Sequence, residues 1–423
     1  MKNIEIIGGG TVYHVRNHLA LTAPAYGKTA RYIHDLCLTH DTWYGKGRYN
    51  INLHLTKMAG GSHLETNEDV SKLLDSLLSN PDTKIIFFNP ALVDYKGTVT
   101  EYQYTGDHWD NLPTSSGKYA ERLKTSEGEK HLLLTPAPKL VSKIRKERKD
   151  IFLVAFKTTC GATEDEQFLT GLHLLKSASC NLVLANDTKT RKNMIITPEQ
   201  ARYSVTTNRT EALAALVEMA IARSNGTFTR STVVNGPSVS WNSDMIPSSL
   251  RTVVNHCIDK GAYKPFNGST VGHFAVKVNQ TDFVTSKRKV DFNKLNDVGM
   301  VLCRAEGKDS VVAYGAKPSV GGQSQRIVFA EHPEMDCIVH FHCPPKPTAS
   351  LSVRNQAPYE CGSHECGKNT STGLREEVPG IKCVYLDNHG PNIVFNRNIE
   401  PEKVISFIEK NFDLSKSTDQ VQR

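Results

Sequence analysis

The first half of this chain of 423 residues alternates short apolar runs with longer stretches whose apolar residues follow a helical period. This alternation is typical of a parallel sheet whose strands are joined by helices. It predicts strands at residues 4–7, 51–55, 84–89, 151–156 and 181–184, and helices at residues 68–78, 138–146 and 209–222. We therefore expect an α/β domain over residues 1–225.

The pattern changes after this domain. Residues 226–247 are rich in Ser, Thr, Asn and Gly and predict a linker, and residues 249–258 predict an amphipathic helix that opens a second domain over residues 248–423. No internal repeat is visible. We therefore expect two domains, both of α/β class.

Three histidines in the second domain suggest a metal site. His340 and His342 stand one residue apart on an apolar run, so on a strand their side chains point to the same face. His389, in Asn388-His389-Gly390, could supply a third nitrogen, and three neutral nitrogens with one open position are typical of a catalytic metal site. The alternative is a pair of half-buried histidines whose rings are merely hydrogen-bonded.

Residues 246–412 resemble the class II aldolase/adducin family. The resemblance rests on the helix at 249–258, the Gly-rich turn and strand at 267–276, the strand and Thr/Ser turn at 283–286, the segment 317–321, and the two histidine motifs. It implies an α/β/α domain, a homo-oligomer, and a divalent metal, most often Zn²⁺, bound by His340, His342 and His389. In the family this metal polarises a substrate oxygen.

The resemblance also implies a substrate site, with two departures from the family. The family's acid/base glutamate aligns with Gly321, which cannot transfer a proton, and a phosphate-binding asparagine aligns with His273. The residues predicted to bind a small anionic substrate are Ser319, Thr285, Ser286, Lys287 and His273.

The segment 359–367 is a candidate to replace the missing glutamate. It contains Glu365, our first choice as general base, then Glu360, with His364 as a further catalytic candidate. One alternative is a surface loop whose charges have no catalytic role. Another is a separate small zinc site on Cys361, His364 and Cys366, which lacks an evident fourth ligand.

Gly8-Gly9-Gly10 follows the first predicted strand, where a backbone could approach a phosphate, although a tight turn would give the same pattern. Residues 1 to about 225 resemble the phosphopantothenoylcysteine synthetase family, a ligase fold with a Rossmann-like parallel sheet and helices on both faces. The matching segments are 9–16, 26–30, 89–95, 135–140, 153–159 and 184–187.

This second resemblance implies a site for CTP or ATP. The positions it assigns to the nucleotide and its phosphates are Gly10, Lys28, Asp94, Phe156, Lys157 and Asn186, with Lys124 as a loose counterpart of the family's flap lysine. The family's asparagine, which holds the acyl-nucleotide intermediate, falls near Ala23. The fold is therefore a firmer prediction than the ligase reaction.

Composition and net charge narrow the range of partners that we expect for this protein. The formal net charge is +7, without basic clusters that carry interleaved aromatics, which favours small anionic substrates over nucleic acid. No apolar run reaches the length of a membrane span and no signal peptide is evident, so we expect a cytoplasmic protein whose ten cysteines are mostly reduced.

Three functions remain open. The first is a metal-dependent aldolase, epimerase or dehydratase, a lyase fused to a domain that binds a nucleotide or a pantothenate-type acid. The second is a carboxylate-amine ligase with an accessory aldolase-like domain. The third is a catalytically inactive binding protein, as adducin-type members of the aldolase family are.

Overall fold

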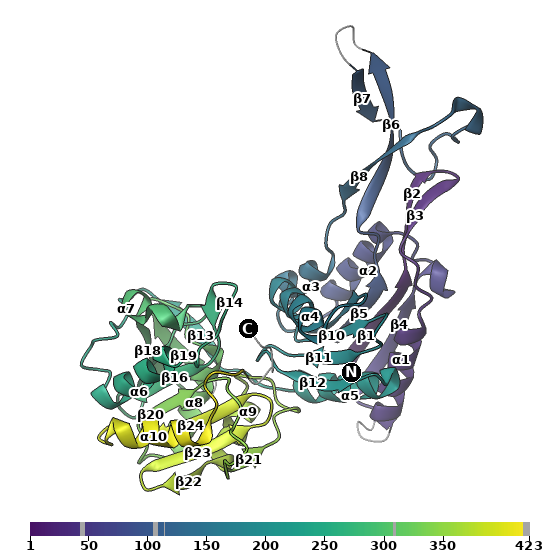
Figure 1. The fold of residues 1–423 in the computed structure, drawn as a ribbon. Helices are drawn as coiled ribbons and strands as arrows, with labels where there is room; N and C mark the ends of the chain where they lie inside the picture. The colour runs from purple at the N-terminus through teal and green to yellow at the C-terminus, as the bar shows by residue number, and fades with distance from the viewer. Residues whose placement is uncertain (43–46, 105–108, 114, 308–309, 418–423) are drawn as a thin grey trace. The chain divides into compact units, whose positions relative to one another are not determined.

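The computed structural model describes the chain except for residues 43–46, 105–108, 114, 308–309 and 418–423. The chain forms two compact units. Unit 1 comprises Met1–Ile195 and Ser204–Ser224, and unit 2 comprises Ile196–Tyr203 and Asn225–Arg423. Each unit is built on a sheet (Figure 1).

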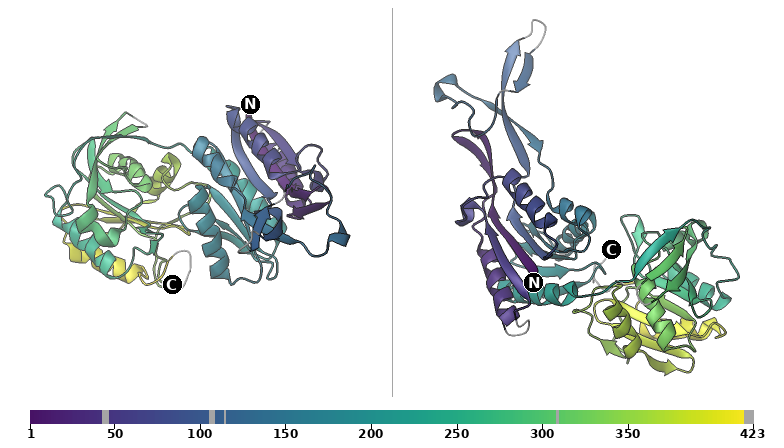
Figure 2. Two further views of the ribbon diagram at one scale, coloured as in Figure 1. Left: turned by 90° about the horizontal axis from the view of Figure 1, so that it is seen from above. Right: turned by 180° about the vertical axis from the view of Figure 1, so that it is seen from behind.

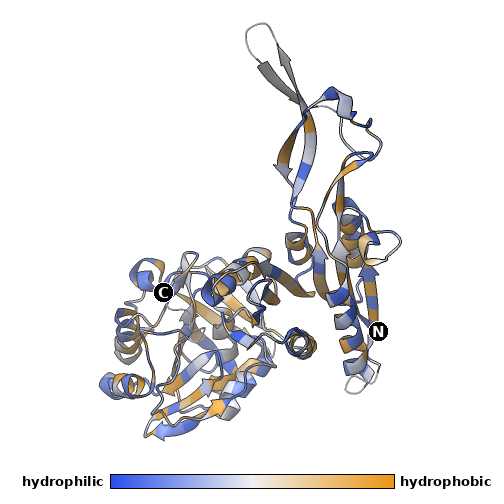
Figure 3. Cartoon of the chain, turned by 45° about the vertical axis from the view of Figure 1, so that its right-hand side comes forward, coloured by the Kyte–Doolittle hydropathy of each residue, from blue (hydrophilic) through white to orange (hydrophobic). Residues whose placement is uncertain are grey.

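Unit 1 is a doubly wound sheet with strand order β12-β11-β10-β9-β5-β1-β4, in which the neighbours from β4 to β10 are parallel. The strands are β1 (Lys2–Gly10), β4 (Tyr49–Leu55), β5 (Thr83–Ala91), β9 (Phe152–Thr159), β10 (Leu182–Asp187), β11 (Asn193–Ile196) and β12 (Arg202–Thr206). Near-continuous apolar runs suit them because helices cover both faces. Figure 3 shows the apolar residues concentrated in such strands.

Five helices cover this sheet (Figures 1 and 2). They are α1 (Lys28–His40), α2 (Asn67–Ser79), α3 (Val141–Glu147), α4 (Glu164–Ala178) and α5 (Arg209–Ser224). α1 packs beside α5, whereas α3 packs beside both α2 and α4. After β1 the chain forms β4 as the neighbour on one side of β1, and then forms β5 as the neighbour on its other side. The strand order therefore reverses between β1 and β5. In such sheets ligands bind outside the carboxyl ends of the strands at the reversal.

Two insertions leave the sheet at that reversal and form an arm that extends away from it (Figures 1 and 2). The first is the hairpin of β2 (Val12–Arg16) and β3 (Leu19–Thr22). The second is a three-stranded sheet of β6 (Tyr95–Tyr104), β7 (Trp109–Pro113) and β8 (His131–Pro136), in the order β7-β6-β8. β2 packs against β6.

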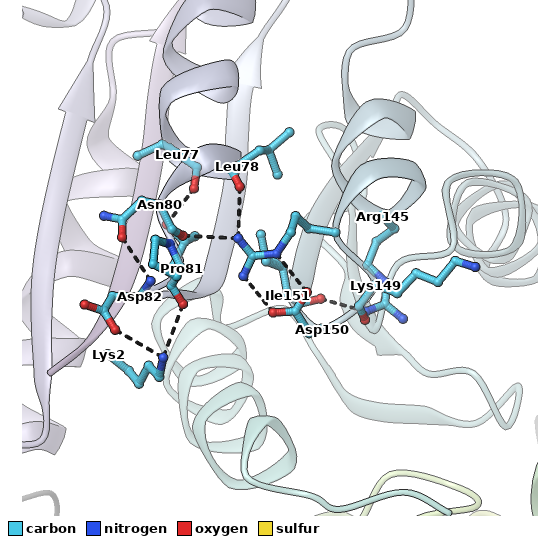
Figure 4. Close-up of polar contacts among 12 residues, drawn as sticks. Lys2, Leu77, Leu78, Asn80, Pro81, Asp82, Arg145, Lys149, Asp150 and Ile151 are labelled. Atoms are coloured by element: carbon cyan, nitrogen blue, oxygen red, sulfur yellow. Dashed lines mark hydrogen bonds and ion pairs between the residues drawn. The ribbon is translucent and has the colours of Figure 1, made fainter. Parts of the chain in front are cut away.

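At the opposite edge of the sheet, where β5 and β9 begin, Arg148 joins the end of α2 to the segment before β9 (Figure 4). The Arg148 guanidinium donates to the carbonyl oxygens of Leu78 (2.9 Å) and Asn80 (3.1 Å) at the end of α2. It also forms a two-point ion pair with Asp150, at 2.8 and 2.7 Å. Arg148 thereby satisfies carbonyl groups that a helix end leaves without partners.

Unit 2 has a ten-stranded sheet in the order β13-β19-β18-β17-β16-β20-β24-β23-β21, with β22 paired to β23. The strands are β13 (Arg230–Val234), β16 (His273–Lys277), β17 (Asp282–Ser286), β18 (Met300–Glu306), β19 (Ser310–Tyr314), β20 (Cys337–His340), β21 (Val353–Arg354), β22 (Arg375–Val378), β23 (Ile381–Leu386) and β24 (Gly390–Phe395). A two-stranded ribbon of β14 (Pro265–Phe266) and β15 (Ser269–Thr270) lies apart from it.

The helices of unit 2 are α6 (Ser248–Asp259), α7 (Leu295–Val298), α8 (Val320–Glu331), α9 (His364–Gly373) and α10 (Pro401–Asn411). The sheet has an apolar core on each face. One core contains buried residues of α6 and α10, and the other contains buried residues of α8 and α9. Alternate residues of each strand enter different cores, as a strand period of two requires.

The structure confirms the α/β class and the predicted elements. The predicted helices correspond to α2, α3, α5 and α6, and the five predicted strands correspond to β1, β4, β5, β9 and β10. The segment 226–247, expected as a linker, contains β13, which pairs in parallel with β19. It also contains Trp241, which is buried in the core beneath α6. This segment therefore belongs structurally to unit 2.

Candidate metal centre and nucleotide edge

β20 places His340 on the α8–α9 face of the unit 2 sheet. Val339 and Phe341 enter the core of α6 and α10, whereas Ile338 enters the core of α8 and α9, so His340 and His342 share the face of Ile338. The strand itself ends at His340, which pairs with His273, the first residue of β16, and with Asn392 of β24. His342 lies just beyond the strand, which corrects the expectation that both histidines are strand residues.

His389 lies in the turn between β23 and β24. The turn requires a left-handed residue, Asn388 (φ 55°), followed by Gly390 (φ 137°). A Cβ on Gly390 would lie 2.1 Å from the carbonyl oxygen of Phe341. Glycine therefore lets the turn approach the backbone between His340 and His342, and this approach brings the third histidine to the other two.

The three histidines form a compact buried cluster. One nitrogen of each lies within 4.8 Å of the others, and the three side chains are 1%, 4% and 2% exposed in sequence order. The ring centroids are 4.6 to 5.0 Å apart and the rings are steeply inclined to one another. This arrangement fits a divalent cation, because separate rings turn ligand atoms toward a common point.

The backbone fixes the tautomer of His340. Its Nδ1–H donates to the carbonyl oxygen of Pro391 (2.7 Å), which leaves Nε2 as the nitrogen with a free electron pair. Nε2 is buried and has no hydrogen-bond partner among the described residues. Burial lowers the pKa of His340 to about 4, so the ring stays neutral near pH 7, as a metal ligand must.

A small cavity adjoins the cluster. His389 and His273 line it, together with Gln325 from α8, Asn392 from β24, and a wall from the start of α9 and the loop before it, formed by Cys361, Gly362, Cys366 and Thr370. Within the described part of the chain, the only group of residues that could hold a metal is the histidine cluster. The alternative zinc site on Cys361, His364 and Cys366 is therefore absent from these residues.

Glu365 and His364 contact another segment of unit 2. Both carboxylate oxygens of Glu365 accept from Thr227, one from the backbone N–H and one from the hydroxyl, each at 2.9 Å. The His364 ring lies 2.7 Å from the hydroxyl of Thr229. Among the described residues that line the cavity, neither Glu365, His364 nor Glu360 is found. Their acid/base role stays a prediction, and these contacts give Glu365 and His364 a structural role.

The predicted substrate residues divide into two groups. Thr285, fully buried on β17, and His273, on β16, lie on the α8–α9 face with the metal histidines. Ser286 is also fully buried, and its hydroxyl has no hydrogen-bond partner within the described chain.

The second group surrounds the start of α8. Ser319 occupies the N-cap and donates its backbone N–H to the carbonyl oxygen of Ser286 (2.9 Å). Lys287 donates to the hydroxyl of Ser238 (2.6 Å) and to the carbonyl oxygen of Val298, and burial lowers its pKa. Ser286 and Lys287, which are adjacent in the sequence, are therefore joined to the N-terminus of α8 through the hydrogen bond from Ser319. Gly321, at the family's glutamate position, lies in the first turn of this helix.

In unit 1 most of the predicted nucleotide residues follow the carboxyl edge of the sheet. Gly10 ends β1, Phe156 and Lys157 lie near the end of β9, and Asn186 lies near the end of β10, where it accepts from Thr158 (3.3 Å). Asp94 follows β5, is exposed, and pairs with Lys139.

The backbone of residues 23–25 packs against Gly10, the last residue of the three-glycine turn. Gly10 donates to the carbonyl oxygen of Ala25 (2.7 Å), and a Cβ on Gly10 would lie 2.0 Å from the carbonyl oxygen of Ala23. Its small size therefore serves a backbone contact. Lys28 is exposed at the start of α1, and Lys124 is exposed just before a short 3-10 helix at Thr125–Glu127.

Sequence reasoning missed Gln325, Asn392 and Pro391. Gln325 is the only one with a local signal, because it stands one helical turn after Gly321 and so shares its face of α8. Asn392 and the carbonyl group of Pro391 enter the site through the pairing of β24 with β20, which a single sequence does not reveal.

Comparison with known proteins supports both resemblances. Residues 256–400 match the family model of the class II aldolase and adducin N-terminal domain. None of the curated protein sequences matches the chain. Among the described residues, no helix has both the length and the apolar composition needed to cross a membrane.

Solved structures similar to the chain fall into the same two groups. A DNA/pantothenate metabolism flavoprotein from Streptococcus pneumoniae is 19% identical, covers 52% of this chain and 97% of its own, and has a TM-score of 0.39. The C-terminal domain of a coenzyme A biosynthesis bifunctional protein is 13% identical, with 52% and 93% covered and a TM-score of 0.35. An L-fuculose 1-phosphate aldolase is 16% identical, with 40% of this chain and 85% of its own covered and a TM-score of 0.30.

Proposed function

We propose that the chain is a two-domain metabolic enzyme whose C-terminal domain is a metal-dependent lyase of the class II aldolase type, acting on a small anionic oxygenated substrate. The observation that carries this proposal is the buried convergence of His340, His342 and His389. An inactive, adducin-like binding protein would not need three buried imidazole nitrogens within 4.8 Å of one another.

The proposed ion is Zn²⁺, because three imidazole nitrogens with one further open position are its usual catalytic ligand set. When bound, the ion would supply Lewis-acid stabilisation of negative charge on substrate oxygens as a C–C or C–O bond breaks. The Pro391 carbonyl group would hold the His340 ring in the orientation that such a ligand needs.

The substrate's anionic end would bind where Ser286, Lys287 and Ser319 come together. α8 carries no acidic residue in its first turn, so its N-terminus favours an anion. The buried Ser286 hydroxyl could donate to the same group. Thr285 and His273 would contact the part of the substrate nearer the metal, since both lie on the histidine face of the sheet.

Proton transfer is assigned to Glu365, with Glu360 and His364 as further candidates. For Glu365 to act, its carboxylate must break its hydrogen bonds with Thr227 and contact the substrate instead.

For unit 1 we propose a site for CTP or ATP, or for a pantothenate-type acid, at the carboxyl edge between β1 and β5. The supporting observation is the reversal of strand order at that point. The nucleotide would contact Gly10, Lys28, Asp94, Phe156, Lys157, Asn186 and Lys124. Carboxylate-amine ligase activity is the second candidate function, with Ala23 in place of the family's asparagine. A homo-oligomer is proposed from both resemblances.

The test of the metal proposal is elemental analysis of the purified protein beside a His340→Ala variant prepared identically. We expect near-stoichiometric zinc, manganese or a similar ion in the natural protein and little in the variant. His256→Ala is the matched control, since His256 pairs with Glu409, outside the histidine cluster. If the natural protein stays metal-free after reconstitution, the lyase proposal is wrong.

The nucleotide proposal is tested separately by titrating CTP and ATP into the full-length protein. Asp94→Ala and Lys157→Ala should both weaken binding, because the resemblance assigns both side chains to the nucleotide and Lys157 also carries a charge that attracts its phosphates. Lys146→Ala, on α3, is the control for the loss of one charge. If neither nucleotide binds, the ligase candidate loses its support.

A further inference from the structure

Gln325 and His273 form a buried pair beside the metal histidines. Gln325, on α8, is 1% exposed, and His273, on β16, is 6% exposed. The Gln325 amide nitrogen donates to Nδ1 of His273, and its amide oxygen accepts from the Thr285 hydroxyl at 3.3 Å. Gln325 and His273 both line the cavity that His389 lines.

This pairing selects one tautomer of His273. A neutral imidazole has one N–H and one nitrogen with a free electron pair. Because Nδ1 accepts from Gln325, the proton is carried by Nε2. The only polar group that His273 has left for the cavity is therefore an N–H donor.

The ring geometry separates His273 from the metal ligands. His273 stands directly opposite His340 across the β16–β20 pair, with ring centroids 4.7 Å apart and planes inclined by only 31°. The two rings are thus tilted against each other by 31°, whereas the three histidines of the cluster are inclined to one another by 67° to 80°. A ring beside the cluster that carries its proton on Nε2 is suited to donate a hydrogen bond next to the ion.

We propose that His273 donates its Nε2–H to the substrate oxygen that gains negative charge, and that Gln325 positions this donor by fixing the proton on Nε2. The inference rests on the proposed metal site, because that site holds the substrate next to His273. The group recognised is an anionic oxygen adjacent to a second oxygen, as in an enediolate or a hydroxamate. Gln325 stands one helical turn after Gly321, the position of the family's acid/base glutamate. On this face of α8 the chain therefore has a glutamine that orients His273 in place of a glutamate that transfers a proton.

The experiment loads the full-length protein with Co²⁺ and titrates acetohydroxamate, following the visible absorption of the cobalt. We expect His273→Phe and Gln325→Leu to keep cobalt and to raise the Kd for acetohydroxamate by about tenfold, the effect of losing one hydrogen bond to a charged oxygen. His256→Phe is the matched control and should leave the Kd unchanged, because that ring lies on α6 and pairs with Glu409.

A second readout reports the tautomer itself. In the zinc-loaded protein with ¹⁵N-labelled histidine, the ring signals lost in His273→Phe identify His273, and they should show the proton on Nε2. Gln325→Leu should change those signals, whereas His256→Phe should not.

Each of the following results would overturn the inference. Loss of cobalt in His273→Phe would make His273 a fourth ligand instead of a donor. An unchanged Kd in either variant, or a proton on Nδ1, would remove the donor role. If the natural protein binds cobalt but not acetohydroxamate, this inference alone fails, whereas failure to bind cobalt at all removes the proposed metal site as well.

Discussion

The two units place their candidate residues in opposite environments. In unit 2 the three candidate metal histidines are buried and lie close together. In unit 1 Lys28, Asp94 and Lys124 are exposed, and the rest follow the edge of a parallel sheet. The proposed metal site is thus preorganised by the core, whereas the proposed nucleotide edge is organised by topology alone.

This difference has a consequence for how each site responds to change. A buried cluster of imidazole nitrogens is coupled to the stability of its core, so metal binding and folding of unit 2 should change together. An exposed edge of long, charged side chains gains little stability from its ion pairs, so substitutions there should affect ligand binding with little effect on folding.

Metal removal should give the largest contrast between the units. At a free metal concentration of about 1000 times the Kd, the bound ion adds about 4 kcal/mol to the free energy of unfolding. Chelation should therefore increase hydrogen exchange in peptides that cover 337–343 and 386–392, and leave peptides over 85–91 in unit 1 unchanged. Equal changes in both units would contradict the comparison.

Gly390→Ala should damage the metal site through the backbone. The new Cβ would lie 2.1 Å from the Phe341 carbonyl oxygen, so the turn that carries His389 must move. We expect a loss of roughly 2 kcal/mol or more in stability and at least a tenfold weaker metal affinity. Gly307→Ala, at a φ of 66° with nothing within 4 Å, is the control and should show only backbone strain of about 1 kcal/mol. Similar metal affinity in the two variants would mean that the Gly390 contact does not position His389.

Glu365→Gln tests the proposed general base. The variant should keep its metal, lose turnover, and lose about 1 kcal/mol of stability, because the amide retains only one of the two acceptors that Thr227 uses. Thr227→Val is the matched control, since it removes one of the same hydrogen bonds without changing the carboxylate. Turnover that survives in Glu365→Gln would exclude Glu365 as the base.

A small pH effect is expected from Glu65 in unit 1. Hydrogen bonds from Lys57 and Lys118 lower the pKa of Glu65 to about 2, and His14 adds a third contact. Because the folded carboxylate stays ionised where an unfolded glutamate binds a proton, its contribution is present above about pH 4.5 and is lost toward pH 2. Glu65 is partly exposed, so the contribution should be under about 1 kcal/mol. Unfolding curves of Glu65→Gln should therefore depend less on pH over this range, and an identical dependence would contradict the assignment.

Much of the fold could be predicted because its signals are local. Apolar runs and helical periods located five strands of unit 1 and four helices within a few residues. The linker prediction for 226–247 was less successful, because the pairing of β13 with β19 joins segments far apart in the sequence.

The site shows the same division at the level of single residues. His340 and His342 could be placed on one face from their spacing alone, but the role of Glu365 could not be judged without its contact to Thr227. His273 was predicted to bind substrate, yet only the amide of Gln325 indicates which ring nitrogen carries its proton.

The sequence by itself determined that this is an α/β chain with three histidines suited to a metal, because residue type and periodicity are properties of short segments. The tertiary structure decided that those histidines meet. The meeting depends on the turn at Gly390 packing against the backbone of Phe341 and on the Pro391 carbonyl orienting His340. Such contacts form between segments that only a folded core brings together, so no local pattern encodes them.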